Sequence, residues 1–541
     1  MRRARAGRTS GREIVLLGVS AAPGVTIGPA VVLGRNDSRR THEAYDVESA
    51  RQALKHVASD LEQLASHLRT DGRGDESEII EAGALMALDP ELTARVQTLI
   101  ADSGLAAGEA LHEATEQTAL ELSRLADPTL AQRADDVRSI GRRAIAHLRG
   151  DASRVLDGVL VADSLGPADV AELAPSVRGI ALAGGGITSH AAIVARSLGL
   201  PMVVGAGAEL FEVEDGEELV VDGDHGLVVR GPDAERAALA RANVDARRAA
   251  REIAIEHRFE PAQTKDGRRI RVLANASTVA ELEEAIRQGA EGVGLVRTEL
   301  LFLDATRWPS PDEQVNVLRP VLTRLQGQTA TVRLFDFGAD KTPAFLRGTA
   351  KRGIEILLDV PEVLRAHLRA VVQAGRGTQL RILVPMVSSA DQMSFVRQAL
   401  DADAQVGAMI ETRKAAEAAE QIAQQCDFLS IGTNDLTQLV LGLDREQSRK
   451  APVLDQRVLT LIAGTMRAGR VAHIPVDVCG EAASDAKSLP VMVGFGADEL
   501  SVAPARVGQV RQWVRELSFE SCRTEAKKLL DQAGHASRKR V

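Results

Sequence analysis

The chain has 541 residues, of which 45% are hydrophobic and 26% are charged, and its formal net charge is −9 at pH 7. This composition suits three or four soluble globular domains and excludes a largely disordered chain, and the negative charge argues against a nucleic-acid-binding surface. No apolar run predicts membrane insertion, and three scattered cysteines are too few for a disulfide framework or a zinc cluster, so we expect a cytoplasmic protein.

The first part of the chain predicts an α/β domain that is interrupted by helices. Residues 1–13 predict a disordered basic extension, because the apolar run after them is too short for a signal peptide. Residues 14–40 alternate short apolar stretches with Pro-Gly and Gly-Pro turns, which is typical of strands. Apolar residues recur at helical spacing through 41–148 and predict an inserted bundle. Strand-like patterns resume in 149–231, which we therefore expect to complete the α/β domain begun in 14–40.

The second part of the chain predicts a barrel. Residues 232–260 form an uninterrupted Ala/Arg/Glu stretch, which indicates a linker helix. In 261–541 short apolar strands alternate with helical stretches in eight units, the rhythm of a (β/α)8 barrel. The strands predicted from this pattern are RIRVLANA, GVGLVRTE, ATVRLFDFG, GIEILL, RILVPMV, VGAMIE, FLSIGTND and PVDVCGE.

One histidine lies at the start of a predicted helix inside the α/β domain. Residues 184–201 read GGGITSHAAIVARSLGLP, which places His190 at the first helical turn. A phosphoryl group on its ring would meet unpaired backbone N–H groups and the positive end of the helix dipole. The same pattern also fits an ordinary helix start with Ser189 as its cap. The functional interpretation of His190 therefore depends on the rest of the chain.

The predicted barrel strands end in groups that suit a small anion and a metal ion. Barrel enzymes place their reactive groups at the C-terminal ends of strands. Glu411 and Asp435 suit Mg²⁺, which takes one or two protein carboxylates and completes its octahedron with water and substrate oxygens. Arg297, Arg333 and Arg445 offer bidentate forks to phosphate and carboxylate groups. The substrate is therefore expected to be a small phosphorylated anion.

Two further groups lie at these strand ends. Cys479 has no sequence signal for an activated thiolate, and an ordinary thiol stays mostly protonated at neutral pH and can donate a proton. Asn434 places an amide beside Asp435. Each residue taken singly fits a structural role equally well, but chance explains the whole set poorly. Cys426 and Cys522 lie outside the pattern, and we interpret both as small packing residues.

In combination, GGGITSHAAIVAR, GVGLVRTE, FLSIGTNDLTQ, LDRE and VCGE closely resemble the phosphoenolpyruvate-protein phosphotransferase family, enzyme I of the bacterial sugar phosphotransferase system. The match covers nearly the whole chain after its first dozen residues. The resemblance implies an α/β multidomain protein, in which a swivelling phosphohistidine α/β domain with an inserted helical bundle is followed by a TIM-like barrel. It also implies that the barrel binds phosphoenolpyruvate and dimerises, and that the bundle binds the phosphocarrier protein HPr.

The resemblance implies a role for each of the residues singled out above. His190 would be phosphorylated on Nε2 by phosphoenolpyruvate and would pass the group to HPr. The residues that would hold the substrate are Arg297, Arg333, Asn434, Asp435 and Arg445. Glu411 and Asp435 would bind Mg²⁺. Cys479 would protonate C3 of the enolate as pyruvate forms.

Three residues depart from the family's pattern. In LRGTAKRGIEI, Glu355 stands where the family has the second arginine of a Gly-x-Arg-x-x-Arg segment. A carboxylate near a bound phosphate would cost about 1 to 4 kcal/mol at about 4 Å, so weaker substrate binding or a rearranged loop is expected. Ile187 replaces a basic residue, and Arg413 replaces a proline.

These departures leave a second hypothesis open, a divergent paralogue of enzyme I that has low activity, another carrier or a regulatory role. The intact central groups, His190, Glu411, Asp435 and Cys479, favour an active enzyme instead. A pyruvate phosphate dikinase or phosphoenolpyruvate synthase would share the α/β domain and the barrel but needs a nucleotide-binding domain. No candidate for that domain is visible before His190.

Overall fold

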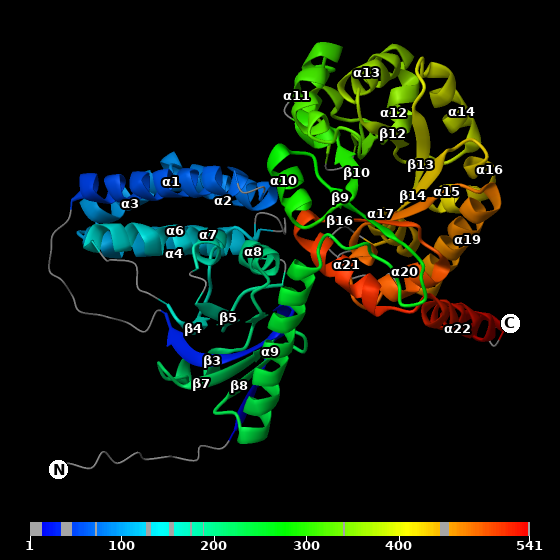
Figure 1. The fold of residues 1–541 in the computed structure, drawn as a ribbon. Coiled ribbons are helices and arrows are strands. Elements are labelled where there is room, and N and C mark those ends of the chain that lie inside the picture. The colour runs from blue at the N-terminus through cyan, green and yellow to red at the C-terminus, as the bar shows by residue number, and fades with distance from the viewer. Residues whose placement is uncertain are drawn as a thin grey trace. The chain divides into compact units, whose positions relative to one another are not determined.

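The computed structural model describes residues 13–33, 46–70, 73–125, 131–150, 156–173, 176–187, 189–303, 305–338, 341–443 and 454–538. The chain divides into two compact units, Met1–Ala250 and Arg251–Val541 (Figure 1). In the part of the chain that is described, no helix has both the length and the apolar character that crossing a bilayer requires.

The first unit contains an eight-stranded mixed sheet in the order β1-β8-β7-β3-β4-β5-β6-β2. Its strands are β1 (Ile14–Leu17), β2 (Val19–Ala22), β3 (Val25–Val32), β4 (Gly158–Ala162), β5 (Val177–Leu182), β6 (Met202–Val204), β7 (Glu218–Asp222) and β8 (Leu227–Arg230). β3 to β6 are parallel neighbours, and the remaining pairs are antiparallel. One face of the parallel strands β3 to β6 packs on α7 (Pro167–Ala171) and α8 (His190–Leu198), and the other packs on η1 (Ala208–Glu212) and on side chains from the antiparallel part of the same sheet. The central strands are therefore buried on both faces, which explains their continuous apolar runs.

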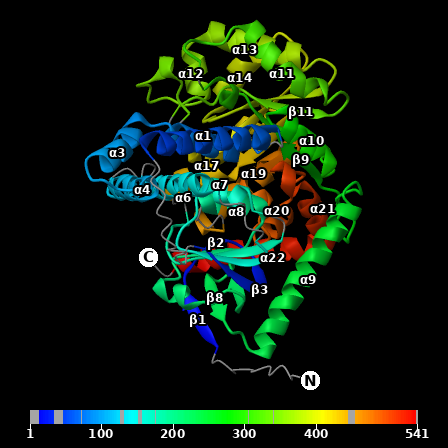
Figure 2. The same ribbon diagram turned by 90° about the vertical axis from the view of Figure 1, so that its left-hand side faces the viewer.

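The chain between β3 and β4 forms a helical bundle whose long helices lie side by side (Figures 1 and 2). Its helices are α1 (Val47–Thr70), α2 (Gly74–Ala87), α3 (Pro90–Ala101), α4 (Ala107–Ser123) and α6 (Ala134–Arg149). Apolar side chains at helical spacing form one buried cluster, which confirms the predicted period. α9 (Ala234–Glu256) follows β8 and is the predicted polar helix.

A partly buried carboxylate joins the bundle to the α/β domain. Asp169 on α7 accepts hydrogen bonds from Arg142 Nη2 at 3.0 Å, Arg143 Nε at 3.1 Å and the backbone N–H of Gly166 at 2.9 Å. Burial alone would raise the pKa of Asp169, but the two guanidinium groups and the backbone donor lower it to about 2. The ionised form of Asp169 therefore stabilises the folded unit.

Asp169→Asn is expected to lower the free energy of unfolding at neutral pH by about 2 kcal/mol, because the folded pKa lies below the ordinary value. That contribution is complete above the ordinary value of 3.8 and is lost as the pH falls towards about 2. Urea unfolding of the wild type and the variant, repeated from pH 7 down to pH 3, measures the difference. A difference that stays constant with pH would contradict the assignment.

The second unit is a closed parallel barrel in the order β10-β11-β12-β13-β14-β15-β16-β9. Its strands are β9 (Arg271–Asn275), β10 (Gly292–Arg297), β11 (Thr329–Arg333), β12 (Gln379–Val384), β13 (Gln405–Ile410), β14 (Phe428–Gly432), β15 (Val476–Cys479) and β16 (Glu499–Val502). The longer helices of this unit are α10 (Val279–Arg287), α11 (Pro311–Thr323), α13 (Pro361–Ala374), α14 (Ala390–Ala399), α17 (Thr433–Leu441), α19 (Gln456–Ala472), α21 (Val507–Glu516) and α22 (Phe519–Arg538).

The shorter helical segments of this unit are α12 (Ile354–Asp359), α15 (Arg413–Glu417), α16 (Ala419–Ala423), α20 (Leu489–Phe495), η2 (Glu299–Phe302), η3 (Ala344–Leu346), η4 (Glu481–Ala483) and η5 (Pro504–Arg506). The predicted fold class, an α/β domain with an inserted bundle followed by a (β/α)8 barrel, is confirmed.

One of the eight predicted barrel strands is wrong, and one strand of the barrel is absent from the prediction. GIEILL is not a strand, because residues 354–359 form the helix α12, in which Ile354 and Leu357 are buried three residues apart. The missed strand is β16, in which Glu499 and Ser501 alternate with apolar residues. The strand ends that carry Glu411, Asp435 and Cys479 therefore belong to the fifth, sixth and seventh strands of the barrel.

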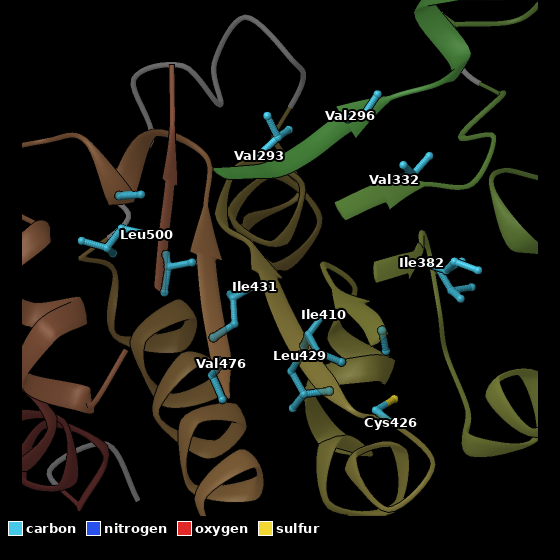
Figure 3. Close-up of a cluster of buried hydrophobic side chains, with 14 of the residues drawn as sticks. Val293, Val296, Val332, Ile382, Ile410, Cys426, Leu429, Ile431, Val476 and Leu500 are labelled. Atoms are coloured by element: carbon cyan, nitrogen blue, oxygen red, sulfur yellow. The ribbon is translucent and has the colours of Figure 1, made fainter. Parts of the chain in front are cut away.

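Apolar side chains from all around the barrel fill the layer between its strands and the surrounding helices (Figure 3). Cys426, which precedes β14, and Cys522 both belong to this cluster, as expected of packing residues. A smaller cluster occupies the interior of the barrel and is formed by Leu295, Leu383, Met409, Phe428 and Cys479.

Candidate active site

His190 is the first residue of α8, and its side chain is almost buried, with 7% of its surface exposed. Ser189 is the N-cap, because its hydroxyl accepts a hydrogen bond from the backbone N–H of Ala192 at 3.3 Å. This is the helix start that the sequence predicts. The loop before it is held by Arg196, whose Nη1 donates to the carbonyl of Ile187 at 3.0 Å.

The imidazole of His190 is oriented by a carboxylate from the inserted bundle. His190 Nδ1 lies 2.9 Å from Asp136 Oδ2 on α6, and Asp136 also accepts from Arg133 Nη1 at 3.1 Å. An ionised carboxylate only accepts, so the neutral ring donates from Nδ1 and keeps its lone pair on Nε2. This contact leaves Nε2 as the ring nitrogen with a free lone pair. The sequence analysis did not identify Asp136.

The mouth of the barrel contains a buried network of opposite charges. Arg333, the last residue of β11, is 3% exposed, donates to Glu299 and lies 3.2 Å from Asp336. Lys341 Nζ lies 3.0 Å from Glu299, and Arg352 Nη2 lies 3.0 Å from Asp336. Burial alone would lower the pKa of Arg333, but the facing carboxylates raise it above the ordinary value. Arg333 therefore stays charged, with its fork fixed in place.

Arg352 connects this network to Asp435, the third residue of α17. Its Nη1 lies 3.1 Å from Asp435 Oδ1, and its Nη2 lies 3.2 Å from Asp435 Oδ2. Glu355, one turn later on α12, is exposed, and no ion pair joins it to another described residue. The predicted repulsion between Glu355 and a phosphate stays a prediction.

Glu411 follows β13 and is fully buried. Its Oε1 accepts from the backbone N–H of Met386 at 2.8 Å, whereas Oε2 has no hydrogen-bond partner among the described residues. Burial, followed by the negative charges of Asp336 and Asp435, raises the pKa of Glu411 to about 8. Met386 holds a left-handed φ of 54°, which a residue with a side chain adopts at a cost. The site thus keeps an unpaired buried carboxylate oxygen, which a cation would satisfy.

Cys479 ends β15 and is 2% exposed. Its Sγ donates to the carbonyl of Ile431 at 3.4 Å. Burial, followed by the charge of Asp477, raises the pKa of the Cys479 thiol to about 12, so the thiol is more firmly protonated than the sequence alone suggests. Beside it, Asn434 Oδ1 accepts from the backbone N–H of Glu481 at 2.9 Å.

Two more of the arginines discussed in the sequence analysis lie at or near the same mouth. Arg297 ends β10, directly opposite Arg333 on β11, and its exposed guanidinium forms no ion pair within the described ranges. Arg413 begins α15 and pairs with Glu417 at 3.2 Å. Arg445 lies outside the described residues. The barrel therefore brings together Arg297, Arg333, Glu411, Asn434, Asp435 and Cys479 at the C-terminal ends of its strands.

Comparisons with known proteins match most of the chain. Family models described as the N-terminal, mobile and PEP-binding domains of PEP-utilising enzymes match residues 17–133, 156–226 and 252–519. A phosphoenolpyruvate-protein phosphotransferase of Streptomyces coelicolor is 34% identical over 95% of this chain and 96% of its own length. The chain belongs to the phosphoenolpyruvate-protein phosphotransferase family. This membership confirms the resemblance drawn from the sequence.

Two further relatives show how much of each protein is shared. A phosphoenolpyruvate-protein phosphotransferase of Haloferax volcanii is 37% identical over 84% of this chain and 85% of its own. A multiphosphoryl transfer protein of Rhodobacter capsulatus is 34% identical over 95% of this chain. The chain spans 66% of this multiphosphoryl transfer protein, slightly less than two thirds of its length.

Proposed function

We propose that the protein transfers the phosphoryl group of phosphoenolpyruvate to Nε2 of His190 and then to a histidine of the phosphocarrier HPr, and that it releases pyruvate. The observation that carries this proposal is the contact between His190 Nδ1 and Asp136, which leaves Nε2 as the nucleophile at a helix N-terminus. Phosphoryl transfer requires mainly positioning and neutralisation of charge. The chain offers positioning at His190 and charge neutralisation at the barrel mouth.

In the barrel, Arg297, Arg333 and Arg445 bind the phosphate and the carboxylate of the substrate, together with Asn434. Arg333 is pre-organised by its buried carboxylate partners, whereas Arg297 is exposed and available to an incoming anion. As the phosphoryl group leaves, the electron pair of the broken P–O bond forms the enolate of pyruvate. Cys479 then donates its S–H proton to C3.

Glu411 and Asp435 would hold Mg²⁺. The fit rests on the buried, unpaired Oε2 of Glu411 and on a second carboxylate at Asp435, since Mg²⁺ takes one or two protein carboxylates. Among the described residues, no group of three or more His, Cys, Asp or Glu side chains is placed to hold a metal ion. When bound, Mg²⁺ would neutralise charge on the phosphate oxygens.

We further propose that residues 14–40 and 149–231 act as the phosphohistidine domain, that 41–148 bind HPr, and that the barrel forms a homodimer. The contact between His190 and Asp136 lies on the bundle, so it belongs to the step in which His190 faces the carrier. Phosphorylation by phosphoenolpyruvate requires that His190 reach the barrel. The three free, buried cysteines suit a cytoplasmic setting.

The test is incubation of the purified protein with labelled phosphoenolpyruvate and Mg²⁺, scoring acid-labile label on the chain. The wild type is expected to take up label, and His190→Ala is expected to take up none. A correctly folded wild type that takes up no label would overturn the proposal in favour of a regulatory paralogue.

Asp136→Asn is expected to slow the transfer from His190 to HPr by about tenfold, because the neutral amide accepts more weakly than the carboxylate and can instead turn its NH2 group towards Nδ1, which favours the other tautomer of the imidazole. Phosphorylation by phosphoenolpyruvate should change less. Rapid-quench measurement of each half-reaction separates the two steps. Asp135→Asn is the matched control, since Asp135 lies next along α6 and pairs with Arg138 at 3.0 Å instead. An equal loss in both half-reactions would argue against an orienting role at the carrier step.

A further inference from the structure

Asp477, a buried carboxylate with no role in the proposed reaction, lies next to Cys479 on the inner side of strand β15. Asp477 is two residues before Cys479 on β15, so both side chains face the barrel interior, and Asp477 is 4% exposed. Its Oδ2 lies 2.7 Å from Ser430 Oγ on β14, and its Oδ1 accepts from Ser501 Oγ on β16 at 2.8 Å. Asp477 therefore sits between two hydroxyl groups on the neighbouring strands.

The hydroxyl of Ser430 connects this carboxyl group to the proposed proton donor. Ser430 Oγ lies 3.7 Å from Cys479 Sγ as well as 2.7 Å from Asp477 Oδ2. These two contacts link Asp477, Ser430 and Cys479 in one continuous line. Because Ser430 is 1% exposed, this line lies inside the barrel. In the resting thiol, Cys479 directs its own proton to the carbonyl of Ile431 at 3.4 Å. Once that proton has gone to the substrate, Ser430 is the donor that remains beside the sulfur.

The surroundings of Asp477 favour its neutral form. Burial, followed by the negative charge of Glu499, raises the pKa of Asp477 to about 7, against the hydrogen bonds from the two serines and the charge of Arg381. Glu499 on β16 is itself paired with Arg381 Nη1 at 2.6 Å and with Arg271 Nη1 at 2.8 Å. These are the charged groups that face Asp477 from β9, β12 and β16.

Cys479 faces a different set of charges. Its pKa of about 12 is raised by burial and by Asp477 and Glu411, and it is lowered by the hydrogen bond from Ser430 and by Arg333. A buried thiolate at this position is thus much more basic than the carboxylate of Asp477. A proton moves downhill from Asp477 to the Cys479 thiolate.

We propose that Asp477, acting through the hydroxyl of Ser430, returns a proton to Cys479 after Cys479 has protonated the enolate, so that a relay inside the barrel reloads the proton donor. The proposal rests on the proposed function, which assigns that protonation to Cys479. In the relay, the O–H bond of Asp477 breaks as its proton moves to Ser430 Oγ, and the original proton of Ser430 forms the S–H bond. The thiolate becomes a thiol, Asp477 becomes a carboxylate, and water returns the missing proton to Asp477 between turnovers.

The relay is tested by two exchange reactions that need only the full chain, phosphoenolpyruvate, pyruvate and Mg²⁺. Exchange of carbon label between pyruvate and phosphoenolpyruvate reports phosphoryl transfer, and it needs no reloading because Cys479 can take back a proton from the pyruvate methyl group. Deuterium entering the pyruvate methyl group from D₂O reports delivery of solvent protons to Cys479. The ratio of deuterium incorporation to carbon exchange isolates the relay, since general structural damage lowers both rates. Cys479→Ala sets the background.

Asp477→Asn and Ser430→Ala are each expected to lower this ratio by about tenfold or more. The amide introduced by Asp477→Asn cannot give up a proton, although it can still hydrogen-bond to both serines. Ser501→Ala is the matched control, because it removes the other hydrogen bond of Asp477 and leaves the line to Cys479 intact. An unchanged ratio in both relay variants would show that solvent reaches Cys479 from the substrate side and would overturn the relay. Absence of carbon exchange in the wild type would overturn the proposed function and the relay with it.

Discussion

Cys479→Ala should still phosphorylate His190 from phosphoenolpyruvate but should release pyruvate about 10²- to 10⁴-fold more slowly, the usual contribution of a positioned general acid. Cleavage of the P–O bond does not require the thiol, so the labelled phosphoryl group still reaches His190. The enolate is then left without its proton donor. Because the pKa of Cys479 is about 12, the wild type keeps this donor protonated well above neutral pH. The rate of pyruvate release should therefore not fall near pH 8.5, where an ordinary thiol loses its proton.

The matched control for this variant is Cys426→Ala. Burial raises the pKa of the Cys426 thiol to about 12 as well, but this side chain packs in the apolar layer outside the strands (Figure 3). Both changes remove one buried sulfur, so a shared effect would reflect packing alone. Rapid-quench assays of phosphohistidine and pyruvate in the same samples separate the two steps. Unchanged turnover of pyruvate in Cys479→Ala would remove Cys479 from the mechanism.

Strand β16 shows why one barrel element escaped prediction. Its inward residues Glu499 and Ser501 are polar, so the strand lacks the continuous apolar run that marks its neighbours. Glu499 is tolerated in the interior because Arg271 and Arg381 on other strands neutralise it, a pairing that exists only in the closed barrel. Conversely, the apolar run GIEILL has too few residues to separate a strand from a helix by its period.

The candidate site also contains residues that could be predicted from the sequence and one that could not. Arg333, Glu411 and Cys479 could be predicted because each ends or directly follows an apolar strand, and parallel strands bring their C-terminal ends together. Asp136 could not be predicted, because it lies 54 residues from His190 on a helix of the inserted bundle. The helical pattern around Asp136 indicates which side of the helix is buried, but it does not indicate that Asp136 contacts the imidazole of His190.

Two arginines at the barrel mouth offer a pair of predictions that separates binding from stability. Arg333 and Arg297 end neighbouring strands and lie opposite each other in register. Arg333 is buried against Glu299 and Asp336, whereas Arg297 is exposed. Arg333→Met should lower the free energy of unfolding by about 3 to 5 kcal/mol, because it leaves buried carboxylates with fewer cationic partners. Arg297→Met should change that free energy by less than about 0.5 kcal/mol, as exposed substitutions usually do.

Both variants are nevertheless expected to lose affinity for phosphoenolpyruvate, since each removes a charged fork that can bind the substrate's phosphate or carboxylate. A charged hydrogen bond contributes about 1.5 to 3 kcal/mol, so each single loss should weaken binding by at least about tenfold. Calorimetric titration with phosphoenolpyruvate and Mg²⁺ measures affinity, and urea unfolding of the same samples measures stability. If Arg297→Met bound as tightly as the wild type, the substrate would be held by the buried network and Arg297 would have no part in binding. If Arg333→Met were as stable as the wild type, Lys341 and Arg352 would suffice to neutralise the two carboxylates.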